Sequence, residues 1–209
     1  MSIGASVRKA FGRHEHRVAE LYRGMFVNLE DYREKILDLA PHATRILEVG
    51  CGEGAVTEVL AGAYPDASIL AIDITPRIGR LYRGRHNGVH FREIPVQDIA
   101  AEQPASFDLV TLSDVIHHIP RELRGDILHA VAACLAPGGR FVLKDWGRAA
   151  TPIHWLCHAG DRFLTEDRVD YLTPAEALTL VTASVPELRI VNRARLRPWP
   201  NNYAFVFQC

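Results

Sequence analysis

The chain lacks several features that would assign it at once to a specialised class. Its four cysteines (Cys51, Cys134, Cys157 and Cys209) include no CxxC pair, which argues against a disulfide framework and a structural zinc site and favours a reducing compartment. No apolar run approaches the ~20 residues that span a bilayer, and the N-terminus lacks the apolar core of a signal peptide. The formal net charge of -1 gives no general attraction to nucleic acid or an anionic membrane. We therefore expect a cytoplasmic protein without a metal site and without membrane insertion.

What the chain contains is an ordinary globular composition with alternating strand and helix patterns. Its 209 residues are 48% hydrophobic and 23% charged, which suits one domain, spanning 1–209. Near-continuous apolar runs at 45–49, 68–73, 107–113 and 139–146 predict buried strands. Helices are expected at 54–64, at 75–85 after Thr75 and Pro76, and at 120–139 before a Pro-Gly-Gly stop. This order predicts a doubly wound α/β fold, with a mostly parallel sheet and helices on both faces.

Three further segments complete the plan. The runs 188–199 and 202–208 are close enough in sequence to form an antiparallel edge pair. Residues of about 5–40, expected to be helical, and the insertion of about 147–173 lie outside the strand-helix alternation. They are candidates for a lid over the substrate, although a plain packing helix also accounts for the insertion.

The stretch "LEVGCGEG" (47–54) forms a glycine-rich turn directly after the first strand. In an open parallel sheet, ligands bind beyond the carboxyl ends of the strands, and glycines there let the backbone approach a ligand. Gly50, Gly52 and Ala55 also satisfy the loose dinucleotide fingerprint, and a purely structural turn is a further alternative. Asp73 ends the second strand, where a carboxylate accepts the hydroxyls of a ribose. Glu48 would repel a pyrophosphate but would favour a ligand that carries positive charge.

With these residues in view, the chain resembles the class I S-adenosylmethionine-dependent methyltransferases over residues 46–146. "LEVGCGEG" resembles the first motif of that family, Asp73 after "LAI" its acidic ribose ligand, and "VQDI" (96–99) the motif whose carboxylate contacts the adenine amino group. "FDLVTLSDVIHHIP" and "LAPGGRFVLKDW" resemble its fourth strand and the turn into its fifth. The resemblance implies a Rossmann-like sheet of seven strands that ends in an antiparallel pair.

The same resemblance implies that S-adenosyl-L-methionine is the cofactor. The residues expected to bind it are Glu48, Gly50, Cys51, Gly52, Gly54, Asp73, Ile74, Gln97, Asp98, Ile99 and Ser113. The family's ligands at the glycines are largely backbone atoms, so Cys51 is interpreted as a small filler and not as a reactive thiol.

Candidates for catalysis lie on the rim formed by the ends of the fourth and fifth strands. Methyl transfer from a sulfonium requires alignment, exclusion of water and, for a proton-bearing acceptor, a base. His117 and His118 are candidate bases, although one or both can simply pack or form hydrogen bonds. Lys144 and Asp145 alternate along a strand, so only one faces the pocket. We choose Asp145, as a substrate anchor or second base, with a loop cap as the alternative. In the insertion, His158 is a further catalytic candidate, and Trp155, His158, Asp161 and Tyr171 are possible pocket residues.

These residues predict an enzyme that methylates an O or N centre of a small molecule, such as a metabolite or natural-product intermediate. "SDVIHH" departs from the Pro-Pro-aromatic turn of enzymes that methylate nucleic-acid bases, so we expect no nucleic-acid partner. Two rival interpretations are an NAD(P)-dependent oxidoreductase and a cofactor-binding interaction protein without catalysis. The sequence defines neither the acceptor nor the oligomeric state.

Overall fold

A computed structural model describes residues 26–76, 78–84, 87–160 and 169–209. Its centre is a seven-stranded sheet in the order β3-β2-β1-β4-β5-β7-β6. The strands are β1 (Arg45–Val49), β2 (Ser68–Asp73), β3 (Val89–Glu93), β4 (Phe107–Ser113), β5 (Leu135–Trp146), β6 (Arg189–Arg195) and β7 (Asn202–Gln208). β7 pairs antiparallel with both β5 and β6, whereas the pairs among β1 to β5 are parallel. The predicted doubly wound fold with an antiparallel edge pair is confirmed.

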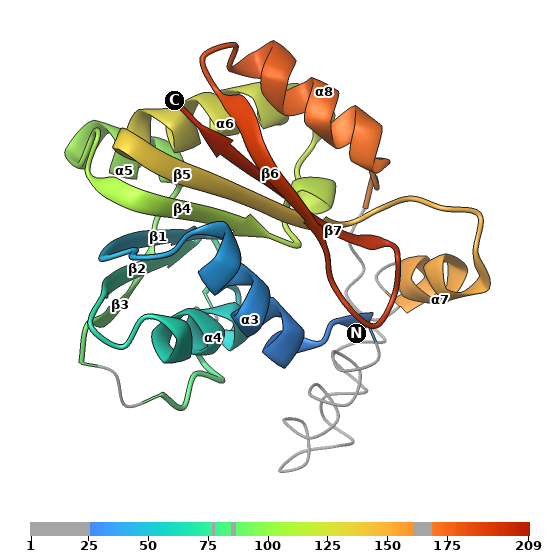
Figure 1. Ribbon diagram of the computed structural model, residues 1–209, viewed down its shortest axis with the longest axis horizontal. Helices are drawn as coiled ribbons and strands as arrows, with labels where there is room; N and C mark the ends of the chain where they lie inside the picture. Colours follow the sequence, from blue (N-terminus) through green and yellow to red (C-terminus); the bar gives the residue numbers. More distant parts are fainter. Residues whose placement is uncertain (1–25, 77, 85–86, 161–168) are drawn as a thin grey trace.

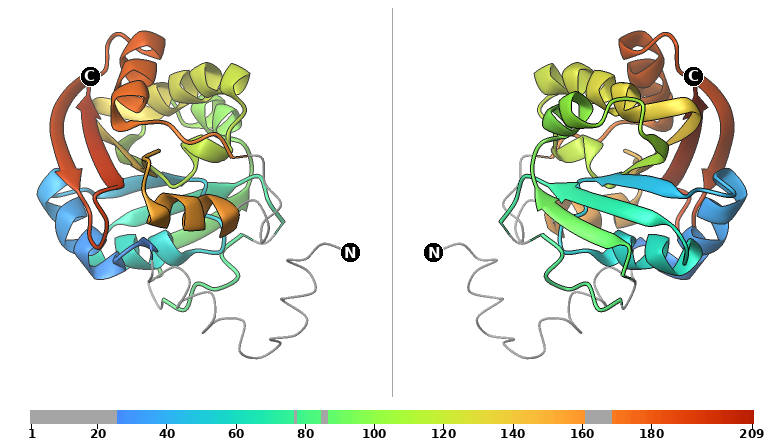
Figure 2. Two further views of the ribbon diagram at one scale, coloured as in Figure 1. Left: turned by 90° about the vertical axis from the view of Figure 1, so that its right-hand side faces the viewer. Right: turned by 90° about the vertical axis from the view of Figure 1, so that its left-hand side faces the viewer.

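Helices cover both faces of this sheet (Figure 1). On one face lie α5 (Val96–Glu102), α6 (Arg121–Cys134) and α8 (Pro174–Ser184), and on the other lie α3 (Leu29–Leu39) and α4 (Ala55–Ala63). The short helix α7 (Pro152–Gly160) covers neither face but lies beyond the carboxyl ends of the parallel strands, as both Figure 1 and the side views of Figure 2 show. This end of the sheet is where open α/β folds bind ligands.

The core forms because most central strands are apolar on both sides. Every residue of β7 from Asn202 to Phe207 is buried, and β4 and β5 carry similar runs. One hydrophobic cluster joins these strands to Ile99, Leu128 and Val181 from the helices of one face. A second cluster joins them to Tyr32, Ile36 and Leu60 from the other face. Burial on both sides fixes the sheet between two helix layers.

Local capping chemistry sets the starts of two helices. α3 begins after Asn28, whose side chain accepts a hydrogen bond from the Asp31 N–H at 3.0 Å. α8 begins with a capping box, in which Thr173 and Glu176 each bond the other's backbone N–H. The α8 helix is absent from the sequence predictions above, although this Thr-Pro-Ala-Glu signature is visible in the chain.

The prediction of a helix at 75–85 is wrong for the residues that the structure describes in that range, which form turns. The Gly79 N–H donates to the Gly52 carbonyl at 2.9 Å, and the Leu81 N–H donates to the Glu53 carbonyl at 2.9 Å. Gly79 also has a φ of +64°. The backbone donors are therefore used across the glycine turn and not four residues back, as an α-helix requires.

Other boundaries also differ from the sequence predictions. β5 begins at Leu135 and includes the Pro-Gly-Gly segment that was expected to end the preceding helix, so α6 stops at Cys134. The edge strand β3 is missing from the predicted strands because its half-exposed residues lack an apolar run. Of the two segments proposed as a lid, residues 5–25 and 161–168 lie outside the described part of the chain.

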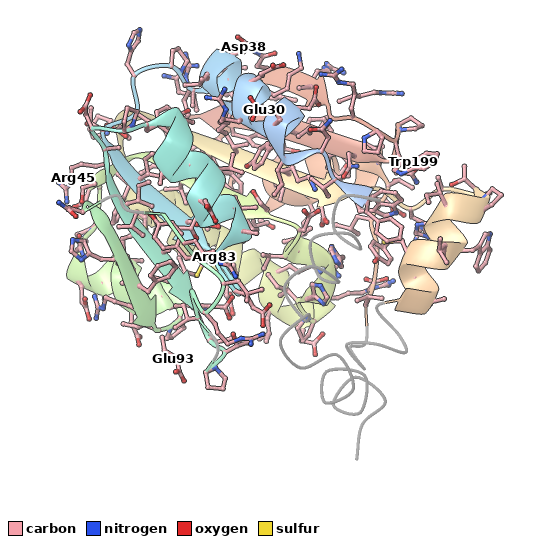
Figure 3. The ribbon with its side chains drawn as sticks, turned by 90° about the horizontal axis from the view of Figure 1, so that it is seen from below. Glu30, Asp38, Arg45, Arg83, Glu93 and Trp199 are labelled. Carbon is pink, nitrogen blue, oxygen red and sulfur yellow. The ribbon has the colours of Figure 1, made fainter. Side chains whose placement is uncertain are left out.

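The C-terminal hairpin holds the segment that precedes α3. The Asn202 side chain donates to the Phe26 carbonyl at 2.6 Å, and the Asn28 N–H donates to the Arg197 carbonyl at 3.0 Å. Asp31 accepts the Arg197 N–H and Nε at 2.8 Å each. Trp199 in this hairpin lies beside α7, at the opposite end of the molecule from Arg45 (Figure 3). Within the described chain, no helix is both long and apolar enough to cross a membrane.

Candidate active site

The glycine turn after β1 presents bare backbone to the end of the sheet. The Gly50 N–H and the Cys51 N–H both donate to the Ile72 carbonyl, at 2.8 and 3.0 Å. Gly50 has a φ of +75°, and a Cβ there would lie 2.4 Å from a methyl carbon of Val115. Gly52 also has a positive φ, of +50°, but a Cβ there would meet nothing within 4 Å. Gly50 is therefore required for packing, whereas Gly52 leaves an open space that a ligand can enter.

Gly54 has a different surrounding from the other two glycines. It precedes α4 with a φ of +94°, and a Cβ there would lie 3.0 Å from the Tyr82 Cβ and 3.2 Å from the Gly79 Cα. The chain at 79–82 therefore packs directly on Gly54 and holds the turn from outside. Arg80 adds an ion pair to Glu53 at 2.6 Å.

Asp73, at the end of β2, is fixed beside the turn. One carboxylate oxygen accepts the Gly52 N–H at 2.8 Å, and the other accepts the Thr75 N–H at 2.9 Å. The Ile94 N–H donates to the Asp73 carbonyl at 2.9 Å, which brings the start of α5 next to this carboxylate. Ile74 follows with 75% of its side chain exposed.

The α5 residues of the expected cofactor site divide into two kinds. Gln97 and Asp98 lie exposed in the first turn of α5. Ile99 has no exposed surface and belongs to the hydrophobic core. Ile99 therefore packs inside the protein and does not face the surface on which a ligand could lie. The core position follows from the helical spacing that also buries Val96.

Glu48 is a carboxylate buried at the end of β1. Only 1% of its surface is exposed, and among the described residues nothing donates a hydrogen bond to its Oε2. Burial raises the pKa of Glu48 to about 8, the Thr57 hydroxyl acts in the opposite direction, and the Asp73 carboxylate raises it further. A buried acceptor without a donor is costly. A cationic group in front of Glu48 would remove that cost and favour the ionised carboxylate.

A cavity of about 440 Å³ opens in front of the turn and extends towards α7. Four of the predicted cofactor residues, Glu48, Gly50, Cys51 and Ser113, line it. Of the others, Ile74, Gln97 and Asp98 are exposed, whereas Gly54 and Ile99 are buried. The remaining lining residues are Phe26, Val27, Leu29, Tyr32, Glu53, Ala55, Val56, Asp114, His117, His118, Lys144, Trp146, Cys157 and Tyr171. Aromatic side chains thus dominate the part of the cavity that lies away from the glycine turn.

His117 meets Asp145 at the wall of this cavity. The His117 Nδ1 lies 2.5 Å from the Asp145 Oδ1, and both side chains are at least 95% buried. The same carboxylate oxygen accepts the Trp146 N–H at 2.7 Å. The carboxylate favours the tautomer with a proton on Nδ1, which leaves Nε2 as the basic nitrogen. The arrangement therefore suits proton acceptance at Nε2.

Lys144 and Asp145 point to opposite faces of β5, as alternation requires, but the residue that lines the cavity is Lys144. The choice of Asp145 as the pocket-facing side chain is wrong, because Asp145 lies behind His117 and reaches the cavity only through it. Lys144 is buried and forms a short ion pair with Asp114. Asp114 has a φ of +57°, a conformation that non-glycine residues seldom adopt.

A chain of aromatic contacts continues from His117 along the cavity. The Tyr171 ring stacks on His117 with centroids 4.6 Å apart, and the His154 ring meets Tyr171 edge-on at 5.1 Å. The His154 Nδ1 accepts the Trp146 indole N–H at 3.0 Å, and Phe26 contacts Trp146 edge-on at 5.6 Å. Burial lowers the pKa of His154, with His158 and Arg148 acting in the same direction, which keeps its ring neutral as a hydrogen-bond acceptor.

The other predicted residues lie at the edge of this cavity or outside it. His118 lines the cavity from an exposed position beside His117, with ring centroids 4.2 Å apart. His158 is half-buried, 6.1 Å from the Tyr171 ring, and is not a lining residue. Trp155 is also not a lining residue and is 68% exposed, so its prediction as a pocket residue is wrong. Asp161 lies outside the described residues.

Sequence reasoning did not identify Phe26, Tyr32 or Lys144 as cavity residues. The Tyr32 hydroxyl lies 2.8 Å from the Ser113 hydroxyl, a contact between residues 81 apart that no local pattern predicts. In the described residues, no group of three His, Cys, Asp or Glu side chains converges as a metal site. Burial raises the pKa of the Cys51 thiol, and Glu48 and Asp73 raise it further, which agrees with a packing role.

A protein-family model and a known relative both match this chain. The sequence model of a family described as "Methyltransferase domain" matches residues 47–141. A "Ubiquinone biosynthesis O-methyltransferase" of Xanthomonas euvesicatoria pv. vesicatoria is 32% identical over 183 residues, which cover 82% of this chain and 73% of that relative.

Two solved structures share the fold at lower sequence identity. The 1,6-didemethyltoxoflavin-N1-methyltransferase of Burkholderia thailandensis, with bound 1,6-didemethyltoxoflavin and S-adenosylhomocysteine, superposes with a TM-score of 0.66 at 20% identity and covers 98% of this chain and 87% of its own. The N-methyltransferase NodS of Bradyrhizobium japonicum, in complex with S-adenosyl-L-homocysteine, gives a TM-score of 0.61 at 21% identity, with 86% of each chain covered.

Proposed function

This chain belongs to the class I S-adenosylmethionine-dependent methyltransferases, and on that premise we propose that it methylates a hydroxyl oxygen of a small aromatic acceptor, with His117 as general base. It is an enzyme that uses S-adenosyl-L-methionine to methylate a small-molecule acceptor. The family assignment replaces the alternative of a nicotinamide-dependent oxidoreductase. The choice of oxygen draws support from the O-methyltransferase relative. The observation that carries the proposal is the His117–Asp145 contact at the wall of an aromatic cavity.

The residues around the glycine turn fit the cofactor. The Glu48 oxygen that lacks a donor suits the ammonium or sulfonium of S-adenosylmethionine. The open side of Gly52 gives access to its backbone, and Asp73 lies next to it, where it can accept ribose hydroxyls. We propose that Ile74 and Asp98, which are exposed beside the start of α5, would hold the adenine.

The acceptor half of the cavity supports a flat aromatic substrate. Phe26, Trp146 and Tyr171 line it, and aromatic walls favour ring stacking and edge contacts with an aromatic ligand. Lys144 and Asp114 line the same cavity as an ion pair, so together they add no net charge. A cavity of about 440 Å³ is of the size that encloses a small molecule, which supports a free acceptor over a nucleic acid.

His117 and Asp145 supply the acid–base part of the reaction. The cofactor supplies a methyl group that is already activated by its sulfonium leaving group. The His117 Nε2 would take the proton of the acceptor hydroxyl as its oxygen receives the methyl group in exchange for the sulfur leaving group. Asp145, bonded to Nδ1, holds the ring and stabilises the imidazolium that forms. The buried walls exclude water, which would otherwise compete for the site.

We also propose that the chain forms one domain with a two-part lid. Phe26, Val27 and Leu29 line the cavity from one side, and Cys157 and Tyr171 line it from the insertion at 147–173. These two segments come from distant parts of the sequence and close the acceptor half together. All four cysteines are free thiols, which supports a reducing, cytoplasmic location.

The direct test combines acceptor identification with a base variant. Incubation with methyl-labelled S-adenosylmethionine and a panel of small phenols and aromatic amines, followed by mass spectrometry, should place the label on an oxygen. His117→Ala should then lower kcat by roughly 10²–10⁴-fold, because a positioned base contributes about that much. The affinity for S-adenosylhomocysteine, measured by calorimetry, should stay close to that of the wild type.

His118→Gln is the comparison variant, since His118 is the exposed neighbour on the same rim. We expect it to reduce kcat far less than His117→Ala. Full turnover in His117→Ala with a phenol would contradict the base assignment, and label found only on nitrogen would contradict the choice of acceptor atom.

A further inference from the structure

The segment 169–171, near the end of the insertion, contacts His117 with both its backbone and a side chain. The Asp170 N–H donates to the His117 carbonyl at 2.8 Å. The next residue, Tyr171, stacks its ring on the His117 ring at an interplanar angle of 20°. His117 is 5% exposed at its side chain, so this stack is part of what separates the ring from water.

Two arginines of α6 hold this segment in place. Arg121 binds the Asp170 carboxylate with two hydrogen bonds, of 2.6 Å from Nε and 2.7 Å from Nη2. Arg124 contacts the same carboxylate at 3.1 Å. Paired, planar contacts of this kind fix geometry as well as charge. The Arg121 contact contributes most to lowering the pKa of Asp170, and Arg124 contributes further, so the carboxylate is ionised at neutral pH.

Arg124 also connects the two pieces of backbone on either side of the contact. It is buried, and its Nε donates to the Ile119 carbonyl at 2.9 Å while its Nη2 donates to the Asp170 carbonyl at 2.9 Å. Ile119 directly follows the 3₁₀ turn η2 (Ile116–His118) that carries His117. One guanidinium therefore bonds both the residue that follows the turn carrying the base and the segment 169–171 that carries its stacked ring.

We propose that Asp170, held by Arg121 and Arg124, is a positioning residue that keeps Tyr171 stacked on His117 and so fixes the orientation of the base. None of these three side chains lines the cavity, so Asp170 acts on the reaction only through His117 and Tyr171. The effect on activity that this proposal predicts rests on the function proposed above. The effect on the chemical accessibility of His117 does not depend on that function. It also gives the Arg121–Asp170 ion pair a role other than stability, since ion pairs at partly exposed sites stabilise a protein little.

The structural readout is the chemical accessibility of His117. Diethyl pyrocarbonate modifies exposed imidazoles, and tandem mass spectrometry distinguishes His117 from His118 in the same peptide. His118 is exposed and serves as the internal reference for the reagent. In Asp170→Ala the His117 ring should be modified several-fold faster relative to His118 than in the wild type, because the stacked ring is no longer held.

The activity readout separates positioning from general damage. In Asp170→Ala, kcat should fall by about tenfold, since small displacements of a catalytic group cost rates of this order or more. The Kd for S-adenosylhomocysteine should not change, because the Asp170 side chain does not line the cavity. Arg121→Ala removes the exposed partner alone and should move both readouts in the same direction by less.

Glu102→Ala is the matched control. Glu102 forms a comparable two-bond pair with Arg92, at 2.6 and 3.2 Å, on the surface outside the cavity. It should leave both readouts at the wild-type level. Should Asp170→Ala fail to fold, Arg121→Ala decides the question by the same two measurements.

Unchanged His117 accessibility in a folded Asp170→Ala variant would overturn the proposal, as would an equal effect in Glu102→Ala. If His117 accessibility rises in Asp170→Ala but His117→Ala retains full turnover, the positioning contact is real and the general-base function is wrong. The two proposals can therefore fail separately.

Discussion

Glu48 is buried, lies near the Asp73 carboxylate and, among the described residues, has no hydrogen-bond donor to its Oε2. Because its pKa is raised to about 8, the ligand-free protein holds a proton on Glu48 at neutral pH. A cationic cofactor favours the ionised form, so binding should release that proton. We expect the affinity for S-adenosylmethionine to rise as the pH increases from 6 to about 8 and then to level off. Calorimetry in buffers of different ionisation enthalpy measures both the affinity and the released proton.

The same residue affects stability in the opposite direction. Without ligand, the folded state binds a proton on Glu48 more tightly than the unfolded chain does. In the unfolded chain the pKa of Glu48 is near 4.5. Stability is therefore lost as the pH rises from about 4.5 to about 8. Glu48→Gln should flatten both pH dependences. A wild-type affinity that is independent of pH, or a slope that survives in Glu48→Gln, would contradict this account.

Individual site residues were predictable where a local motif carries them. Glu48 and Asp73 follow from their places at the ends of two strands, and His117 from its place on the rim. The role of Asp145 was not predictable, because it depends on where the turn after β4 places His117. Tyr32 meets the cavity through a contact with a distant segment, and no spacing in the chain encodes it. Strand alternation limited the pocket-facing side chain to Lys144 or Asp145 but did not decide between them.

At the scale of an element, the glycine turn gives a pair of contrasting substitutions. Gly50→Ala should destabilise the protein by about 2–3 kcal/mol, since its Cβ would meet Val115 at 2.4 Å and must displace packed atoms. Gly52→Ala should cost only about 1 kcal/mol, from its positive φ. It should nevertheless weaken S-adenosylhomocysteine binding by about tenfold or more, because the methyl group enters the open space.

Gly62→Ala is the control for this pair. Gly62 lies exposed in α4, where a Cβ would meet only an arginine side-chain carbon at 4.0 Å. Alanine should stabilise that helix by roughly 0.5–1 kcal/mol without a change in binding. Urea titration and calorimetry measure the two quantities, and equal binding by Gly52→Ala and the wild type would show that the ligand does not approach the turn there.

The elements themselves were predictable where burial is uniform along the chain. The strands β1, β2, β4 and β7 read as apolar runs because they are covered on both faces. The edge strand β3 has no such run, and the predicted helix at 75–85 failed because Gly79 and Leu81 bond the glycine turn. The conformation of such segments depends on hydrogen bonds to distant parts of the chain, which local propensity does not reveal.

At the scale of the whole molecule, the two helix layers share one sheet, and we expect them to unfold together. Differential scanning calorimetry should show a single transition. S-adenosylhomocysteine at 100 times its Kd should raise the free energy of unfolding by about 2.7 kcal/mol, because it binds only the folded state. Two resolved transitions, or one transition that ligand does not move, would contradict a single domain built around this site.

The fold class follows from the order of strands and helices, but the shape of the acceptor cavity depends on contacts over nearly the full described chain. Part of its wall comes from residues 26–32, before the first strand, and part from Cys157 and Tyr171 of the insertion. Neither segment belongs to the repeating plan, so the sequence supports a lid only as an unassigned insertion. Packing at the end of the sheet is what converts these segments into cavity walls.

The bonds from the β6–β7 hairpin to Phe26, Asn28 and Asp31 have a consequence for the growing polypeptide. The early segment that borders the acceptor is tied down by residues 197–202, which are synthesised well after it. The glycine turn and its strands can form well before then. A nascent chain can therefore acquire the place for its cofactor before the place for its acceptor, and the two are joined only once the hairpin has been synthesised.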